Sequence, residues 1–428
     1  MNNIEFFREK INNGDNELFK SLYGNEAKIL NQQARAYGLL MERFVSVFKN
    51  SEKVGLFSSP GRTEIGGNHT DHNSGRVLAG SVSLDIIAAA APNNTDIIRI
   101  SSAGYPDFEV DCRDTAPRED ERYTAAALVR GIVAGLRNMG FDCKGFDACI
   151  EGRVPKGSGL SSSASFEVLT GAIISHFFND GQLDPVKNAI TGQYAENNYF
   201  GKPCGLMDQT ACAVGGFITI DFNDPRNPVV KKVNFDFTST DHSLVITDTG
   251  GDHAALNEDY ASLPGEMKSV ASALGAGVLR EVTLDDIVKA IPELRQKTGD
   301  RAILRAYHFQ KDNQRVVRQV EALERGDFKS FLEMVVESGY SSFMYNQNIY
   351  SPNSIKEQGV ALGLAMSEMI LKGEGAWRVH GGGFAGTIQA FVPDDLLDEY
   401  IVAMENIFGK FSCYNLFIRN IGAAALKF

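Results

Sequence analysis

The sequence predicts an α+β protein built from two lobes. Strand-like and helix-like segments alternate in both halves of the chain, which is typical of mixed architectures. The chain has 428 residues, more than one domain usually holds, and 43% of them are apolar, enough for ordinary packed cores. We therefore expect one lobe over residues 1–230 and a second over residues 231–428.

In the first half, the elements follow from hydrophobic periodicity and from turn residues. Leucine and phenylalanine recur at three- and four-residue steps over residues 16–49 and predict a helix. Further helices are expected at 124–140, 161–178 and 184–198. Strands are expected at 54–58, 77–91, 96–101, 108–112, 146–150 and 217–222. The polar run 223–228 fits either a linker or a hairpin turn.

The second half opens with a predicted strand at 243–248 and is then mainly helical. Helices are expected at 266–275, 284–291, 313–325, 327–339 and 352–371. Two more strands are predicted at 376–380 and 387–392. A basic run within this half fits a solvated helix face or a contact between the lobes; it comprises Arg301, Arg305, Lys311, Arg315 and Arg318.

Charge and cysteine content exclude several classes of partner. The formal net charge is −12, which argues against a general nucleic-acid or membrane-surface binder. We find no apolar run long enough to span a bilayer. The six cysteines show no paired spacing and fit free thiols of a reducing compartment. We therefore expect a cytoplasmic protein, with a monomer as the expected state.

The first segment that carries chemistry is residues 60–75, PGRTEIGGNHTDHNSG. It lies between two predicted strands, and we interpret it as a surface loop that offers donors and acceptors to a polyhydroxylated ligand. A polar loop with a buried Asp71 explains it equally well. A metal site is a weaker alternative, because His69, Asp71 and His72 match part of the HxHxDH pattern but Gly67 replaces its first histidine.

The second segment, residues 154–165, reads VPKGSGLSSSAS. A strand, a Gly/Ser loop and a helix in this order predict a phosphate cradle, because backbone N–H groups and the positive helix end face the anion. The alternative is a serine-rich cap over a packed helix. The segment is not a Walker A loop and lacks the third glycine of GxGxxG. Arg153 and Lys156 are expected to supply local positive charge.

The third segment, residues 375–387, reads GAWRVHGGGFAGT. Its three consecutive glycines permit close approach of the backbone to another group, although a plain hairpin connection fits as well.

Together, the three segments resemble the three motifs of the GHMP small-molecule kinases. The first resembles the galactokinase signature GRxNLIGEHTDYNxG. The second resembles PxGAGLSSSAS with Ser158 in place of alanine, and the third resembles GGGFGG with Ala385 in place of glycine. A fourth segment, residues 195–209, is similar to the family's AEN…CGIMDQ. The resemblance covers about residues 18–428. It implies a two-lobed GHMP kinase fold, with an N-terminal mixed-sheet lobe, a C-terminal ferredoxin-like α/β sandwich lobe and the active site between them.

The resemblance also implies a reaction: transfer of the ATP γ-phosphoryl group to the anomeric C1 hydroxyl of galactose, giving galactose 1-phosphate and ADP. In the family's pattern Asp208 orients the hydroxyl and accepts its proton, and Arg62 pairs with Asp208. Mg²⁺ would be held by Ser163 and Glu196. The implied sugar-binding residues are Asn68, His69, Asp71, Gly205 and Tyr260. The implied ATP-binding residues are Lys156, Gly157, Ser158, Gly159, Leu160, Ser161, Ser162 and Ser163.

Departures from the family's pattern leave the sugar open. Asn68 stands where galactokinases typically have a glutamate that contacts the sugar near C6, so galacturonate, L-arabinose or N-acetylgalactosamine are alternative substrates. Glu64 replaces an asparagine and His72 a tyrosine. His380, where the family often has threonine, is interpreted as structural. Other hypotheses are a non-catalytic galactose and ATP sensor and a GHMP kinase acting on homoserine or mevalonate.

Overall fold

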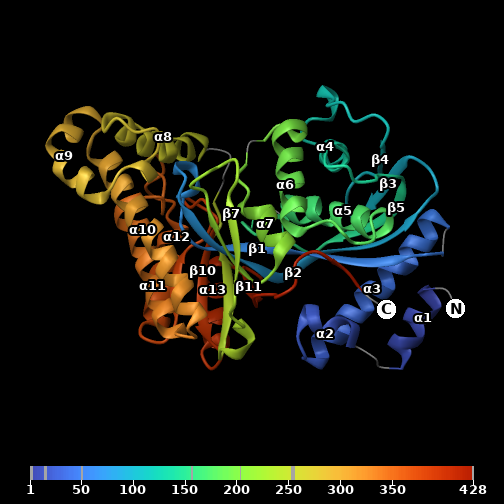
Figure 1. Ribbon diagram of the computed structural model, residues 1–428. Helices are drawn as coiled ribbons and strands as arrows, with labels where there is room; N and C mark the ends of the chain where they lie inside the picture. Colours follow the sequence, from blue (N-terminus) through green and yellow to red (C-terminus); the bar gives the residue numbers. More distant parts are fainter. Residues whose placement is uncertain are drawn as a thin grey trace.

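The computed structural model describes residues 3–13, 17–49, 52–155, 158–202, 204–251 and 256–426. These residues form two lobes side by side, each built on one sheet (Figure 1). Within the described part of the chain, no helix is long and apolar enough to cross a membrane. All six cysteines are free thiols, as the sequence predicts.

The first lobe is built on a mixed sheet of eight strands. Its main path runs β12-β1-β2-β5-β3-β4, with β6 on β2 and β7 on β6. Only β3 and β5 pair in parallel. The strands are β1 (Gly55–Gly66), β2 (Arg76–Pro92), β3 (Ile97–Ser102), β4 (Phe108–Asp111), β5 (Phe146–Gly152), β6 (Phe217–Asp221), β7 (Val229–Val233) and β12 (Ala424–Ala425).

Helices cover both faces of this sheet, so its strands carry apolar side chains on both sides. Phe57 and Ala88 pack in the larger core with α4 and α5, whereas Leu56 and Ile87 pack toward α1 to α3. The helices of this lobe are α1 (Asn3–Asn12), α2 (Glu17–Tyr23), α3 (Ala27–Phe48), α4 (Ala125–Asn138), α5 (Ser162–Phe178), α6 (Pro185–Ala195) and α7 (Met207–Val214). A π-helical segment, Glu196–Phe200, follows α6.

The second lobe is an α/β sandwich on a four-stranded antiparallel sheet in the order β11-β8-β10-β9. Its strands are β8 (His242–Asp248), β9 (Ala376–Val379), β10 (Thr387–Pro393) and β11 (Cys413–Leu416). Its helices are α8 (Asn257–Ala273), α9 (Leu284–Lys297), α10 (Asp300–Glu324), α11 (Phe328–Ser341), α12 (Gly359–Leu371) and α13 (Leu397–Phe408). A second π-helical segment, Ser342–Asn346, follows α11.

One prediction about the first segment is wrong: its first half is not a surface loop. β1 continues through Gly66, and all twelve residues of the strand are buried. Its backbone pairs with β2 inside the molecule, with Arg62 opposite Ser81 and Thr63 opposite Gly80. Apolar alternation, which the sequence analysis used, does not detect a strand whose buried positions are polar. The run 223–228 is a hairpin turn, because β6 and β7 pair antiparallel.

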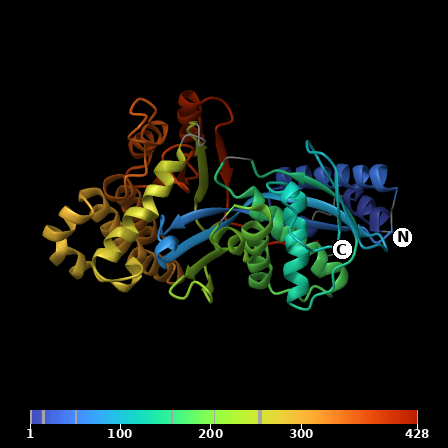
Figure 2. The same cartoon turned by 90° about the horizontal axis from the view of Figure 1, so that it is seen from above.

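β1 and β2 are long enough to reach the second lobe. Figure 2 shows them running from the N-terminal helices toward α8 and α10. The turn between them, which includes residues 67–75, therefore lies against the second lobe. We keep the division near residue 230 as a proposal: β7 spans this residue and belongs to the first sheet, β8 opens the second sheet, and β12 returns to the first.

Candidate active site

The charged centre of the site is an ion pair between two residues that are far apart in sequence. Arg62 Nε donates to Asp208 Oδ1 at 2.8 Å, joining the middle of β1 to the first turn of α7. Ser161 Oγ donates to the second carboxylate oxygen, Asp208 Oδ2. Burial lowers the pKa of Arg62, but the adjacent Asp208 carboxylate outweighs burial and raises it, so the guanidinium stays charged. The side chain of Asp208 is 33% exposed and so is open to a ligand.

The second segment meets this ion pair from the other side. Arg62 Nη1 donates to Gly159 O, and the Arg62 N–H donates to Leu160 O at 3.0 Å. Ser161 adopts the left-handed conformation with φ 58°, and its hydroxyl goes to Asp208 and does not cap α5. The N–H groups at the start of α5 are therefore left for an anion. Ser158 to Ser163 lie along this turn, whereas Lys156 and Gly157 lie outside the described residues.

Arg153 does not face this turn. Its guanidinium forms hydrogen bonds with Asp85, Gln33 and Tyr23 OH, the last at 3.1 Å. The side chain is 19% exposed and points toward α2 and α3. The prediction that Arg153 supplies positive charge to the phosphates is therefore wrong, because its charge is already compensated by the buried Asp85.

The residues expected to bind sugar converge on the third segment. His69 Nε2 donates to Gly382 O at 2.9 Å, and Tyr260 OH donates to Gly383 O at 2.9 Å. A Cβ at Gly382 would lie 2.6 Å from the Tyr260 ring, so this position needs glycine for the close approach. His69 has a φ of 59°, and this left-handed backbone costs about 1 kcal/mol or more, which its fixed hydrogen bond offsets.

Asp71 and Gly205 face one another across the same region. A Cβ at Gly205 would lie 3.1 Å from Asp71 Oδ2, so a side chain there would crowd the carboxylate. Asp71 begins a 3₁₀ turn that ends at Asn73, in the connection between β1 and β2. The exposed His72 ring stacks near His69, with centroids 6.2 Å apart. Among the described residues, no three His, Cys, Asp or Glu side chains converge as a metal site.

Asn68 directly precedes His69, but its side chain is occupied by other residues of the protein. Its side chain is fully buried and bonds to Glu64, Gly381 and Asn348. The predicted sugar contact of Asn68 stays a prediction, and the structure assigns its amide other partners.

The expected metal ligands lie behind Asp208. Gln209 Nε2 donates at 3.0 Å to both Glu196 and Glu167, two buried carboxylates. Burial raises the pKa of Glu167, and the neighbouring Glu196 carboxylate adds to this rise. One oxygen of Glu167 has no hydrogen-bond partner among the described residues. Glu167 lies one turn after Ser163 on α5, so a carboxylate and a hydroxyl share one face of this helix, and both are oxygen donors of the kind that Mg²⁺ prefers.

His380 joins the third segment to the second. Its Nδ1 lies 2.9 Å from Thr387 Oγ1, and the Thr387 hydroxyl donates to Ser158 O at 3.3 Å. The Thr387 hydroxyl hydrogen points to Ser158, so the hydrogen between Thr387 Oγ1 and His380 comes from Nδ1. Nδ1 therefore carries the imidazole proton, and Nε2 carries only a lone pair. That nitrogen is buried without a partner in the described structure. Burial lowers the pKa of His380 well below 6.5, and the charges of Arg62 and Arg378 add to this effect.

We expect His380 to make the protein sensitive to acid. Burial keeps this imidazole neutral in the folded protein at pH values where the unfolded chain is protonated, so the unfolded chain takes up more protons below about pH 6.5. Stability from this group is present above that pH and decreases as the pH falls, by up to ~1.4 kcal/mol per unit. Urea unfolding at pH 7 and pH 5 should show a smaller loss for His380→Gln than for the wild type. The exposed His72→Gln is the control, and an equal loss in all three proteins would contradict the assignment.

The first segment is held by a group of second-lobe residues that was not predicted from the sequence. Asp312 accepts from the backbone N–H of Asn68, and His308 lies one turn before it on α10. Arg315, which belongs to the basic run, pairs with Asp312 on the same helix and with Glu337 on α11, so the interpretation of this run as a contact between the lobes stays a prediction. Their spacing of three and four residues places these side chains on one face of a helix, which could have been read from the sequence. The spacing does not indicate which segment of the chain this face contacts.

Comparison with known proteins agrees with this geometry. Residues 127–216 match the model of the GHMP kinases N terminal domain, and residues 42–92 match the galactokinase galactose-binding signature. A galactokinase from Streptomyces coelicolor is 31% identical over 375 residues, covering 87% of this chain and 92% of that protein.

Two solved structures share the fold. Lactococcus lactis galactokinase complexed with galactose has a TM-score of 0.75 at 24% identity, covering 91% of this chain and 99% of that one. Methanococcus jannaschii mevalonate kinase has a TM-score of 0.60 at 14% identity, covering 85% of this chain and 98% of that one. The two lobes and the three converging segments thus define a GHMP kinase. Within that superfamily, the chain belongs to the galactokinase family.

Proposed function

We propose that this sugar kinase transfers the γ-phosphoryl group of ATP to the C1 hydroxyl of galactose, giving galactose 1-phosphate and ADP. The observation that carries the proposal is the Arg62–Asp208 pair, which lies between the start of α5 and the third segment. Membership of the galactokinase family supports the choice of sugar. A cytoplasmic location, which the free thiols support, and a monomeric state remain proposals.

In this mechanism the chain acts mainly by positioning groups and compensating charge. Asp208 orients the C1 hydroxyl and accepts its proton as the oxygen attacks phosphorus in line with the leaving ADP oxygen. Arg62 holds Asp208 and neutralises charge on the transferring phosphoryl group. The N–H groups at the start of α5 bind the phosphates, with Ser158 to Ser163 along the turn; Lys156 and Gly157 belong to the same proposed site.

The donor set behind Asp208 fits a magnesium ion. Ser163 and Glu196 would hold it, and Gln209 fixes the orientation of the Glu196 carboxylate by its hydrogen bond at 3.0 Å. The ion would supply charge compensation for the phosphate oxygens when bound. His69, Asp71, Gly205 and Tyr260 are the proposed sugar contacts.

An ATP-consumption assay tests the proposal with galactose, galacturonate, N-acetylgalactosamine, L-arabinose and glucose as acceptors. We expect galactose to give the highest kcat/KM, with ³¹P and ¹³C NMR identifying the product as the 1-phosphate. Omitting Mg²⁺ should abolish turnover. Faster turnover of another sugar would overturn the choice of substrate, and binding of galactose and ATP without turnover would identify a sensor.

A further inference from the structure

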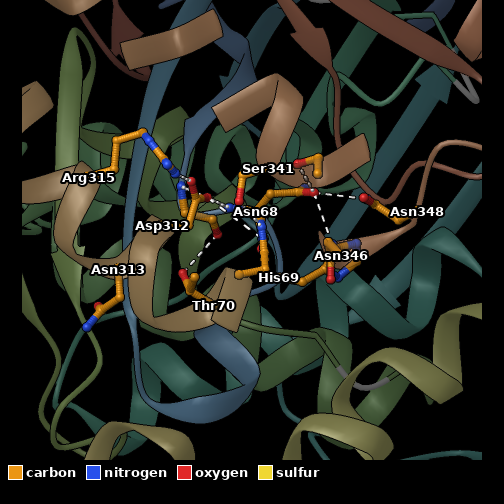
Figure 3. Close-up of polar contacts among 12 residues, drawn as sticks. Asn68, His69, Thr70, Asp312, Asn313, Arg315, Ser341, Asn346 and Asn348 are labelled. Atoms are coloured by element: carbon orange, nitrogen blue, oxygen red, sulfur yellow. Dashed lines mark hydrogen bonds and ion pairs between the residues drawn. The ribbon is translucent and has the colours of Figure 1, made fainter. Parts of the chain in front are cut away.

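The backbone of Asn68 is held by two buried residues of α10. Its N–H donates to Asp312 Oδ2 at 2.8 Å, and its carbonyl accepts from His308 Nε2 at 2.9 Å. Figure 3 shows Asn68 and His69 between Asp312 and Arg315 on one side and Asn346 and Asn348 on the other. Asp312 and His308 are both 0% exposed, so neither bond competes with water.

The amide of Asn68 fits in only one orientation. Its Nδ2 donates to Glu64 Oε1 and to Gly381 O, both at 2.9 Å. Its Oδ1 accepts from Asn348 Nδ2 at 2.9 Å and from Ser342 Oγ at 3.2 Å. The nitrogen thus faces two groups that accept, and the oxygen faces three that donate, since Asn346 Nδ2 also lies 3.5 Å from it. A carboxylate in the same place would put negative oxygen against Glu64 and Gly381.

Most of these partners belong to the second lobe. α10, the π-helical segment Ser342–Asn346, Asn348 and the third segment each supply at least one, whereas Glu64 comes from β1. His69 follows Asn68 directly, and Asp71 lies two residues further on. The hydrogen bonds of Asn68 therefore join the two lobes next to His69 and Asp71, two of the proposed sugar-binding residues.

We propose that Asn68 is a positioning residue, which locks the first segment to the second lobe and thereby places His69 and Asp71 against the sugar without touching it. The proposal rests on the proposed function and changes the role that the resemblance implies for this position. Because every donor and acceptor of Asn68 is already used inside the protein, a sugar hydroxyl would have to break one of these bonds to reach it.

Asn68→Asp tests the lock, since the side chain keeps its size but loses its two donors and gains a negative charge beside Glu64. We expect kcat/KM for galactose to fall roughly tenfold to a hundredfold, mainly through KM, with ATP affinity measured by calorimetry within about twofold. Asn223→Asp, which adds the same charge on the exposed β6–β7 turn, should behave as wild type.

A set of monodeoxy galactoses separates positioning from direct contact. If Asn68 acts through the first segment, Asn68→Asp lowers kcat/KM by a similar factor for galactose and for the 2-, 3-, 4- and 6-deoxy sugars. If Asn68 binds one hydroxyl, the effect of the substitution disappears for the sugar that lacks this hydroxyl, and the proposal is overturned. Wild-type kinetics in Asn68→Asp would also overturn it.

The double variant Glu64→Gln with Asn68→Asp keeps the test valid if the single variant folds poorly. It moves the negative charge across one hydrogen bond and restores a donor between the two side chains, so we expect at least about threefold recovery of kcat/KM or of folded yield. No recovery would contradict the lock. If the wild type itself does not phosphorylate galactose, the proposed function fails. The lock is then still tested by thermal unfolding of the single and double variants, in which the changes in stability at positions 64 and 68 should not be additive.

Discussion

Asp208→Asn lowers kcat for galactose phosphorylation by roughly a hundredfold to ten-thousandfold, the range expected for loss of a positioned proton acceptor. The substitution keeps the shape of the side chain and a hydrogen bond acceptor for Arg62, so the fold is retained. ATP affinity, measured by calorimetry with a non-hydrolysable analogue, should change by less than about threefold, because the N–H groups of α5 are untouched.

The control for this substitution is Asp285→Asn, in the exposed first turn of α9, far from the ion pair. It should leave both kcat and ATP affinity at wild-type values. Turnover of Asp208→Asn within tenfold of the wild type would remove Asp208 from the proton-transfer step. A loss of ATP affinity equal to the loss of kcat would instead show that Asp208 acts on nucleotide binding.

The second large effect is on stability and comes from Arg378→Met. Arg378 is 0% exposed, pairs with Glu64 at 3.0 Å and donates to Ile65 O. Burial raises the pKa of Glu64, and the Arg378 charge counteracts that rise. Removing the guanidinium leaves a buried carboxylate uncompensated, so we expect the free energy of unfolding to fall by about 3–5 kcal/mol.

Two further variants test this explanation. Arg378→Met combined with Glu64→Gln should recover a large part of the lost free energy, because no unpaired charge remains. Arg226→Met, at a side chain that is 92% exposed, should change the free energy of unfolding by less than about 0.5 kcal/mol. Urea unfolding of all four proteins at pH 7 supplies the measurement. A loss below about 1 kcal/mol in the single variant would contradict the role given to Arg378.

The regular elements of the fold could be predicted where apolar periodicity is strong. α4 and α5, and the strands β2 and β5, lie within a few residues of their predicted bounds. The second half of β1 could not be predicted in this way, because Arg62, Thr63 and Glu64 are buried polar residues. α13, β7, β11 and β12 were not predicted. β12 has only two residues, too few for periodicity.

The motifs of the site could be predicted from the sequence, but the hydrogen bonds and ion pairs between distant segments could not. Arg62 and Asp208 are 146 residues apart, and only the resemblance to a family joined them. The second-lobe partners of Asn68 come from segments 240 to 313 residues away, which no local spacing indicates. The orientation of Arg153 was also beyond the sequence, because its partners Tyr23 and Gln33 lie on helices with no motif of their own.

The return of the chain to the first sheet has a consequence for folding. Arg419, which is 1% exposed, donates to Ser58 Oγ at 2.6 Å, and Leu426 N donates to Leu56 O at 2.8 Å. These residues are synthesised after the whole second lobe, yet they complete the edge of β1. The first lobe therefore cannot complete the edge of β1 on the ribosome while the second lobe is still being made.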